Sequence, residues 1–341
     1  MYFYVMKRIL FLFFSILVLS SCRKDVVIPE EFDGFVVPPT FPAPSYKFEN
    51  NPVTQAGFEL GRKIFYDPQL SRDNTISCGS CHLQSSAFAQ VDHAVSHGVD
   101  NKLGTRNAPA IQNMAWQSEF FWDGGVHDLD LFSFAPIANP VEMDEKVSNV
   151  LVKMQNSASY PTLFEKAFGS KEINSTRMMQ ALSQFMTMLI SANSRYDQYV
   201  AGNSSVLNAD EVEGLAIFRN KCANCHTEPL FTDNAFRNNG LDKTGDLGRY
   251  RITLNEADKF KFKVPSLRNV QKTYPYMHNG KMATLEKVLD HYQKGIIQSP
   301  TLDPQLALSL NITDQEKIKI IAFLKTLTDD EFIRKPAFSE Q

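Results

Sequence analysis

Two short cysteine–histidine motifs constrain this chain more than any other feature. They are the pentapeptides 78–82 and 222–226, each of the form Cys-x-x-Cys-His; the thiols are Cys78, Cys81, Cys222 and Cys225, and the histidines are His82 and His226. Each thiol pair can form thioethers with the two vinyl groups of one haem, and the following histidine can bind its iron. A zinc site would need four ligands around one ion, and a redox dithiol needs no following histidine. The motifs therefore predict two covalently bound haem c groups.

The first residues have the pattern of a bacterial export signal. Lys7 and Arg8 precede an apolar run over residues 9–19, and small residues lead to Cys22. A cysteine at this point predicts a lipoprotein, with residues 1–22 as signal peptide and Cys22 acylated and anchored to a membrane. An ordinary cleaved signal and an uncleaved N-terminal anchor are the alternatives. We expect a lipid-anchored protein of the periplasm or cell envelope.

Charge and hydropathy narrow the function classes. The chain of 341 residues has a formal net charge of −3 and contains no run rich in lysine and arginine, so we expect no nucleic-acid partner. After the first 22 residues, no apolar stretch is long enough to span a bilayer. The size is compatible with two domains.

Periodicity and capping signals outline the organisation. Residues 23–50 are rich in proline and phenylalanine without helical periodicity, which predicts a tether. Helical stretches are expected over residues 54–66 and 175–199, the second with Met179, Leu182, Met186 and Leu189 on one buried side.

The second half carries two helix-start signals. Asn208 with Glu211, and Thr313 with Glu316, have the spacing of capping boxes. A polar stretch over residues 202–205 suggests domains at 51–203 and 204–330. We predict an all-α fold of two cytochrome-c-like haem domains packed together, with little β structure.

Four further segments carry a resemblance to a known family. They are Arg106–Pro109, Phe121–Gly124, Pro136–Met143 and Tyr274–Gly280. In content and order they resemble the bacterial di-haem cytochrome c peroxidases, a family that includes the MauG-type oxidases, from about residue 50 to 330. The resemblance implies that the N-terminal haem reacts with peroxide and that the C-terminal haem relays electrons.

For the N-terminal haem, the resemblance makes His82 the proximal ligand and Glu142 the distal catalytic carboxylate. A carboxylate there can move a proton between the two peroxide oxygens. Pro136 matches a residue of the distal pocket, whereas Phe132 stands where the family usually has glutamine, so a hydrogen-bond donor is lost. His97 resembles the histidine that blocks the iron in resting peroxidases; in the MauG branch this position stays open.

The resemblance also assigns residues between the haems and at the second one. Trp122 matches the tryptophan that carries electrons between the haems, and Asn107 with the carbonyls of Thr273 and Pro275 matches a Ca²⁺ site. His226 is the proximal ligand of the C-terminal haem. Its sixth ligand is Tyr292 by alignment with MauG-type proteins, with Met277 and Met282 as alternatives. Lys263 and Arg268 either meet haem propionates or are solvated.

The expected function is reduction of hydrogen peroxide to water with electrons from a small cytochrome c or similar donor. The alternatives are a MauG-like oxidase acting on a protein or peptide partner, and a di-haem electron carrier without substrate. Family members are often dimers, so a homodimer is possible here.

Overall fold

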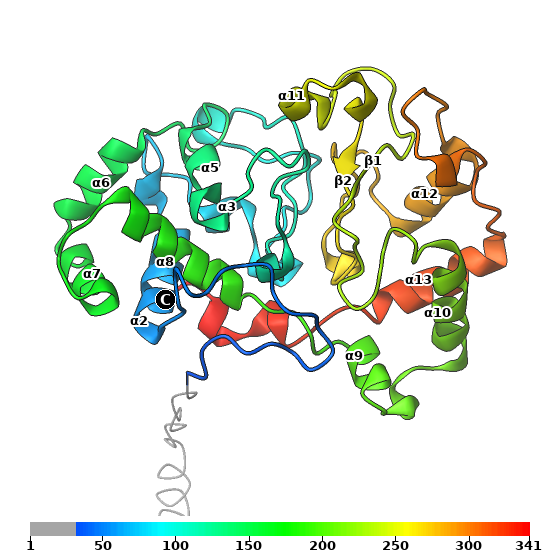
Figure 1. Ribbon diagram of the computed structural model, residues 1–341, viewed down its shortest axis with the longest axis horizontal. Helices are drawn as coiled ribbons and strands as arrows, with labels where there is room; N and C mark the ends of the chain where they lie inside the picture. Colours follow the sequence, from blue (N-terminus) through cyan, green and yellow to red (C-terminus); the bar gives the residue numbers. More distant parts are fainter. Residues whose placement is uncertain (1–31) are drawn as a thin grey trace, which may run out of the picture. The chain divides into compact units, whose positions relative to one another are not determined.

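The computed structural model describes residues 32–341, so the predicted signal peptide, the acylated Cys22 and the first part of the predicted tether lie outside the described residues. Residues 34–341 form one compact unit. Its helices gather into an N-terminal and a C-terminal lobe (Figure 1). Within the described chain no helix is both long and apolar enough to cross a membrane.

Most of the regular structure is helical. The α-helices are α2 (Gln55–Tyr66), α3 (Cys78–Cys81), α4 (Leu129–Phe132), α5 (Phe134–Ala138), α6 (Val147–Gln155), α7 (Tyr160–Phe168), α8 (Ser175–Met188), α9 (Arg195–Val200), α10 (Ala209–Lys221), α11 (Tyr250–Thr253), α12 (Leu285–Asp290) and α13 (Asp314–Lys325). A π-helical turn, η9 (His291–Gly295), follows α12 directly.

Short 3-10 helices and one small sheet complete the fold. The 3-10 helices are η2 (Pro68–Leu70), η3 (Gln84–Ser86), η4 (Val99–Asn101), η5 (Met114–Trp116), η6 (Ser204–Val206), η7 (Glu256–Asp258), η8 (Val270–Lys272), η10 (Pro304–Leu306), η11 (Phe332–Arg334) and η12 (Pro336–Phe338). Strands β1 (Phe236–Arg237) and β2 (Phe262–Lys263) pair antiparallel. The predicted all-α fold class with little β structure is confirmed.

Helices α2 and α8 pack closely at the centre of the N-terminal lobe. Thr54 caps α2 by accepting a hydrogen bond from the Gly57 N–H. At Gly61 a Cβ atom would lie 1.9 Å from the Ala181 carbonyl oxygen, so only glycine permits this approach. The expected inward side of α8 is confirmed as core, since its predicted members are buried: Met179, Leu182, Met186 and, just past the helix end, Leu189.

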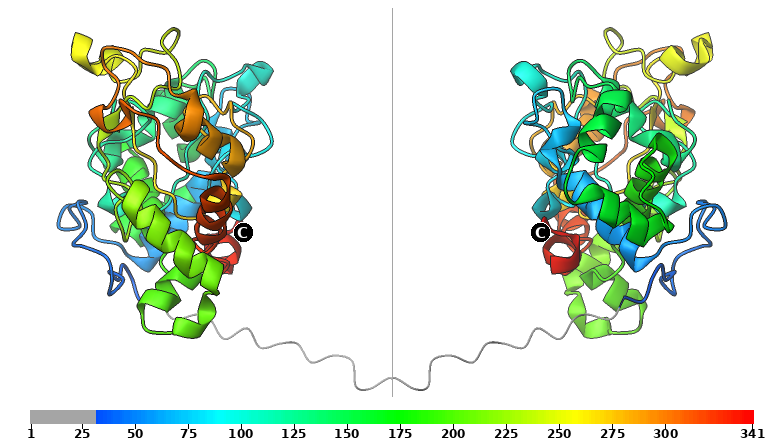
Figure 2. Two further views of the ribbon diagram at one scale, coloured as in Figure 1. Left: turned by 90° about the vertical axis from the view of Figure 1, so that its right-hand side faces the viewer. Right: turned by 90° about the vertical axis from the view of Figure 1, so that its left-hand side faces the viewer.

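Helices α10 and α13 repeat this arrangement in the C-terminal lobe. A Cβ atom at Gly214 would lie 2.0 Å from the Lys319 carbonyl oxygen. Both predicted capping boxes are present, at the start of α10 and at the start of α13. Figure 2 views the unit from its two ends, with the C-terminal helices facing the reader on the left and the N-terminal lobe on the right.

The predicted helix over residues 175–199 is interrupted. Helix α8 ends at Met188 and α9 begins at Arg195. Between them the backbone N–H groups of Ala192 and Asn193 donate to one carboxylate oxygen of Asp329, at 3.0 and 2.9 Å. These bonds satisfy backbone donors that a continuous helix would have used, and a capping box then starts α9.

The tether prediction is wrong for residues 34–50, which pack on the fold. Phe35 and Phe41 lie with ring centroids 5.6 and 5.0 Å from the Trp116 ring. The Trp116 indole N–H donates to the Pro42 carbonyl at 2.8 Å. Aromatic side chains gain from burial without any regular secondary structure, so the absence of periodicity did not exclude a packed segment.

Packing between the lobes crosses the expected boundary near residue 203. Tyr196 of α9 belongs to the hydrophobic core of the C-terminal lobe. Conversely, residues 332–339, called the C-terminal strap below, lie on the N-terminal lobe beside α2 (Figure 1). Arg62 donates to the Ala337 carbonyl at 2.7 Å, and the Tyr66 hydroxyl donates to the Phe338 carbonyl at 2.8 Å.

Candidate functional site

The first Cys-x-x-Cys-His motif forms a single helical turn. Ser77 and Ser80 start α3 with reciprocal bonds, the Ser77 N–H donating to the Ser80 hydroxyl at 3.0 Å. Cys78 and Cys81 carry free thiols. The next residue, His82, pairs its Nδ1 with the Phe88 carbonyl oxygen at 2.8 Å. This bond assigns the proton to Nδ1 and leaves Nε2 as the ligating nitrogen.

The second motif has the same design at the end of α10. Cys222 and Cys225 are free thiols, and Nδ1 of His226 pairs with the Phe231 carbonyl oxygen at 3.1 Å. Burial lowers the pKa of His82 to about 4 and also lowers the pKa of His226. Both imidazoles are therefore neutral at pH 7, the form that binds a metal.

A strained phenylalanine orients each of these histidines. Phe88 and Phe231 have positive φ angles of 59° and 55°, and both rings are completely buried. A left-handed backbone costs a non-glycine residue about 1–2 kcal/mol, so packing of the ring must hold it there. Sequence reasoning missed this pair, although each phenylalanine follows its histidine by a similar distance.

The structure also brings Glu142 to the first motif. It lies in the loop after α5, half-buried, and its carboxylate Oε1 accepts a 2.7 Å hydrogen bond from Asn139 Nδ2. Burial raises the pKa of Glu142, and the Asn139 bond partly opposes this. Burial raises the thiol pKa of Cys78 to about 12 and of Cys81 to about 11, with the Glu142 charge adding to both.

The segment that carries His97 is docked on Glu142. The Val99 N–H donates to the Glu142 carbonyl at 2.8 Å, and a Cβ atom on Gly98 would lie 2.6 Å from the Glu142 Cα. His97 itself pairs its Nδ1 with the Asn101 side-chain oxygen at 2.6 Å, and its ring meets that of exposed His93 at 4.9 Å. Ligation by His97 stays a prediction.

Phe132 makes this part of the site apolar. Its buried ring stacks on Phe121 at 4.7 Å between centroids, and meets Phe120 at 5.7 Å. Pro136, in α5, accepts the Met143 N–H at 3.2 Å. The position where the family usually has glutamine is thus part of an aromatic cluster that includes Phe121, the residue before Trp122 in the sequence.

Trp122 contacts segments of both lobes. Its indole N–H donates to the Asn107 carbonyl at 2.8 Å, and its own carbonyl accepts the Lys263 N–H at 2.8 Å. Its ring lies 6.5 Å from the buried His278 ring, which stacks on Phe262 at 3.7 Å.

Asn107 is docked on the loop that holds the other two predicted calcium ligands. Its backbone N–H donates to the His278 carbonyl at 2.8 Å, and its side-chain Nδ2 donates to the Ala94 carbonyl at 3.2 Å. Thr273 and Pro275 lie in this same loop, just before His278. Within residues 32–341, no group of three or more His, Cys, Asp or Glu side chains could hold a metal ion.

Two of the three predicted sixth ligands lie around one amide in the C-terminal lobe. Asn239 Nδ2 is 3.4 Å from the Tyr292 hydroxyl and 3.5 Å from the Met277 sulfur. Burial raises the pKa of Tyr292, and the nearby Cys225 and Cys222 thiols add to the rise. Tyr292 sits in the π-helical turn η9, a rare conformation that is frequent at functional sites. Met282 pairs with Tyr276 through its backbone.

The two cations considered for propionates are engaged by protein groups. Arg268 is fully buried and forms two hydrogen bonds with the Asp197 carboxylate, at 2.9 and 2.8 Å. Lys263 donates to the Glu119 carbonyl at 2.7 Å, and burial lowers its pKa to about 8. Neither side chain is simply solvated.

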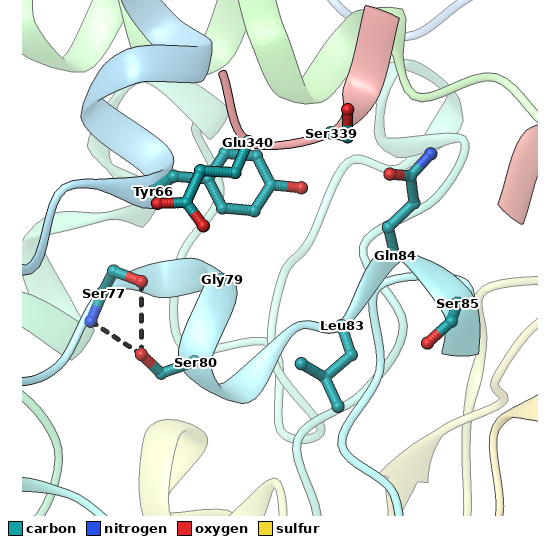
Figure 3. A pocket seen from close by; sticks show the side chains of 9 residues that line it. All are labelled: Tyr66, Ser77, Gly79, Ser80, Leu83, Gln84, Ser85, Ser339 and Glu340. Atoms are coloured by element: carbon teal, nitrogen blue, oxygen red, sulfur yellow. Dashed lines mark hydrogen bonds between the residues drawn. The ribbon is translucent and has the colours of Figure 1, made fainter. Parts of the chain in front are cut away.

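A pocket of about 430 Å³ lies beside the first motif (Figure 3). The Tyr66 ring lines it and covers Gly79, where a Cβ atom would lie 2.4 Å from the ring. Glu142 is not among its lining residues; these are Tyr66, Ser77, Gly79, Ser80, Leu83, Gln84, Ser85, Ser339 and Glu340. The candidate catalytic carboxylate therefore does not line this pocket.

The paired lobes and their two dithiol turns define the class, a di-haem c-type cytochrome. The family model described as "Di-haem cytochrome c peroxidase" matches residues 55–205, and the family model described as "Cytochrome c" matches residues 211–328. The chain belongs to the di-haem cytochrome c peroxidase family, as the sequence motifs predicted.

Named relatives fall in both branches of this family. Methylamine utilization protein MauG of Methylorubrum extorquens is 36% identical over 283 residues, 81% of this chain and 79% of that protein. Cytochrome c551 peroxidase of Nitrosomonas europaea is 36% identical over 280 residues, 80% of each chain. A MauG-like protein associated with microbial copper homeostasis has a similar structure, with a TM-score of 0.81 at 32% identity, covering 91% of this chain and 99% of that one.

Proposed function

We propose that this protein is a di-haem cytochrome c peroxidase that reduces hydrogen peroxide to water with electrons from a small cytochrome c or similar donor. The observation that carries the proposal is the Glu142 carboxylate beside the first dithiol motif, where its charge affects both thiols. A protein that only carried electrons would not need a half-buried carboxylate at that place. Relatives named cytochrome c peroxidase support the same activity.

The residues of both motifs fit covalently bound haem c. The four thiols are free to form thioethers, and each histidine has one nitrogen hydrogen-bonded and the other available. When bound, the haem at His82 would supply the redox chemistry of peroxide cleavage and the haem at His226 would store and pass electrons. Every other step falls to the chain's own side chains.

Glu142 would transfer protons between the two oxygens of hydrogen peroxide. Hydrogen peroxide needs two electrons and two protons to become two water molecules. A carboxylate beside the bound peroxide can accept the proton of one oxygen and return it to the departing oxygen. Because burial raises its pKa, the Glu142 carboxylate can accept a proton more readily than an exposed glutamate.

The segment between the lobes would connect and fix the two centres. Trp122 is hydrogen-bonded to segments of both lobes, which suits a path for electrons. Asn107 with the carbonyls of Thr273 and Pro275 would bind Ca²⁺ through oxygen donors and hold this geometry. His97 would be a further side chain that holds the iron of the N-terminal haem at rest, and its segment would have to move to admit peroxide.

A MauG-like oxidase acting on a protein or peptide partner is the second candidate. Two observations favour it: Phe132 places an aromatic ring where peroxidases usually have a glutamine, and the Tyr292 hydroxyl lies near the second dithiol. Tyr292 would be the sixth ligand of the C-terminal haem.

The cellular setting is also part of the proposal. The N-terminal pattern supports export and a lipid anchor at Cys22, in the periplasm or cell envelope. Cytochrome c peroxidase relatives support a small cytochrome as electron donor. A homodimer would agree with the dimeric state that is common in this family.

Steady-state oxidation of reduced cytochrome c by hydrogen peroxide tests the proposal. Replacement Glu142→Gln should lower kcat/KM for peroxide by about 10²–10⁴-fold, because it removes the proton-transfer group while preserving shape. The control Glu165→Gln, on the exposed side of α7, should change nothing. Full activity in the Glu142→Gln protein would refute the proposed role. Turnover of a peptide partner without cytochrome oxidation would favour the MauG-like alternative.

A further inference from the structure

Asn139 stands three residues before Glu142 and touches its carboxylate. We infer that Asn139 is a positioning residue, which holds Oε1 of Glu142 so that Oε2 is the oxygen that carries the proton. This inference rests on the proposed function, since it assigns the geometry behind the role given to Glu142.

The orientation of the Asn139 amide is fixed by its own loop. Its side-chain oxygen accepts the Val141 N–H at 3.2 Å, the contact of an Asx turn. The amide nitrogen must then point the other way, and it donates to Glu142 Oε1 at 2.7 Å. With the opposite orientation, Asn139 would direct its NH₂ group at a backbone donor and an oxygen at a carboxylate.

The backbone of Glu142 is held on two sides. Its N–H donates to the Asn139 carbonyl at 3.0 Å, and its carbonyl accepts the Val99 N–H at 2.8 Å. The main chain therefore leaves the carboxylate little freedom except rotation of the side chain. Since Asn139 engages Oε1, and no residue of the described chain hydrogen-bonds Oε2, the second oxygen is free to meet a substrate.

Among the residues that the structure describes, no cation forms an ion pair with the Glu142 carboxylate. Three segments approach Glu142: helix α3, residues 96–104 and the loop of Glu142 itself. Their titratable or charged side chains are Cys78, Cys81, His97, Asp100, Lys102 and Asp144. Nearby Arg72 and Lys102 are both paired with Asp100 and Asp144, at 2.5–3.6 Å. Within residues 32–341, Asn139 is the side chain that hydrogen-bonds Glu142.

The decisive variant is Asn139→Asp. It keeps an oxygen to accept the Val141 N–H, so the turn is retained, but it replaces the donor to Glu142 with a second negative charge. Loss of the hydrogen-bond donor and addition of a negative charge both disfavour the ionised form of Glu142, so the pKa of Glu142 should rise by about one pH unit or more. At a pH below the pKa of Glu142, a rise of one pH unit in that pKa should slow the peroxide reaction about tenfold.

Two readouts follow this change in the haem-loaded protein. The first is the pH dependence of the second-order rate with hydrogen peroxide, whose acid limb should move to higher pH. The second is an infrared titration of the protonated carboxyl band that disappears in Glu142→Gln, which reports the same group without turnover. Asn149→Asp is the matched control, because Asn149 donates to Glu145 at 2.9 Å outside the site, and it should move neither readout.

Unchanged profiles in Asn139→Asp would overturn the inference. Should that variant not fold, Asn139→Ser decides instead, since its hydroxyl can accept the Val141 N–H but is too short to reach Glu142. The two proposals can fail separately. If Glu142→Gln leaves the peroxide reaction intact, the proposed function fails. If Glu142→Gln loses the peroxide reaction but both Asn139 variants keep wild-type pH profiles, only the inference about Asn139 fails.

Discussion

At the residue scale, the buried pair of Arg268 and Asp197 anchors the C-terminal lobe. The guanidinium is completely buried, and its central carbon lies 4.7 Å from the Phe41 ring centroid and 5.7 Å from the Phe231 ring centroid. The second ring belongs to the residue whose carbonyl orients His226. An ion pair in this position is expensive to break on one side, because the remaining charge stays buried.

Replacement Asp197→Asn should therefore destabilise the protein by about 3–5 kcal/mol, measured by urea denaturation at pH 7. The exposed pair of Asp330 and Arg334 provides the control, and Asp330→Asn should give no measurable change. Equal midpoints for the two variants would contradict the importance of the buried pair.

The same pair predicts a pH dependence of stability. Burial alone would raise the pKa of Asp197, but hydrogen bonds from Arg268 and its charge lower the pKa below the ordinary 3.8. A carboxyl with a depressed folded-state pKa stabilises the fold above its unfolded-state pKa, and this stabilisation is lost as the pH falls through the folded-state value. The wild-type protein should thus lose stability below about pH 4 more steeply than Asp197→Asn, in urea titrations at a series of pH values.

Tyr292 allows a prediction about the C-terminal haem. A phenolate ligand lowers the reduction potential compared with a thioether. We expect Tyr292→Phe to raise the potential of this haem in spectroelectrochemistry, whereas replacement of either alternative ligand, in Met277→Leu or Met282→Leu, should leave it unchanged. A changed potential in Met277→Leu, with none in Tyr292→Phe, would show that the sulfur near Asn239 is the ligand.

At the scale of elements, each lobe depends on a helix pair with a glycine at the crossing. The Gly61→Ala change would place a methyl group against α8, and Gly214→Ala would place one against α13. Because the nearest atoms are backbone carbonyls, the helices must separate, at a cost of about 1–3 kcal/mol each. Thermal unfolding should reveal both losses, while Asn220→Ala on the exposed side of α10 should change the melting temperature little. Wild-type melting in both glycine variants would contradict this packing.

At the scale of the whole molecule, the C-terminal strap joins the end of the chain to the first haem motif. The Phe332 ring lies 5.7 Å from the ring of Phe88, whose carbonyl orients His82, and the Phe338 ring packs on Phe332. Replacement Phe338→Ala should destabilise the protein by about 3 kcal/mol, seen by chemical denaturation, with Glu340→Ala at the neighbouring exposed position as control. An unchanged midpoint would mean that the strap contributes nothing to the lobe beneath it.

Local signals in the sequence predicted much of the fold. The two dithiol motifs, the capping boxes at Asn208 and Thr313 and the periodicity of α8 depend on neighbours within a few residues, so they were readable. The family motifs also predicted the meeting of Glu142 with the first dithiol. The site's remaining features depend on contacts across long stretches of chain: Asp329 interrupting the expected helix, Asp197 pairing with Arg268, and Phe35 and Phe41 folding onto Trp116. The periodicity of the sequence contains no information about contacts between residues so far apart in the chain.

Mass spectrometry of the denatured holoprotein tests the central claim most directly, since only covalently held haem survives denaturation. We predict two haem mass increments per chain, one on the peptide containing Cys78 and Cys81 and one on the peptide containing Cys222 and Cys225. A chain carrying a single increment, or none, would contradict it.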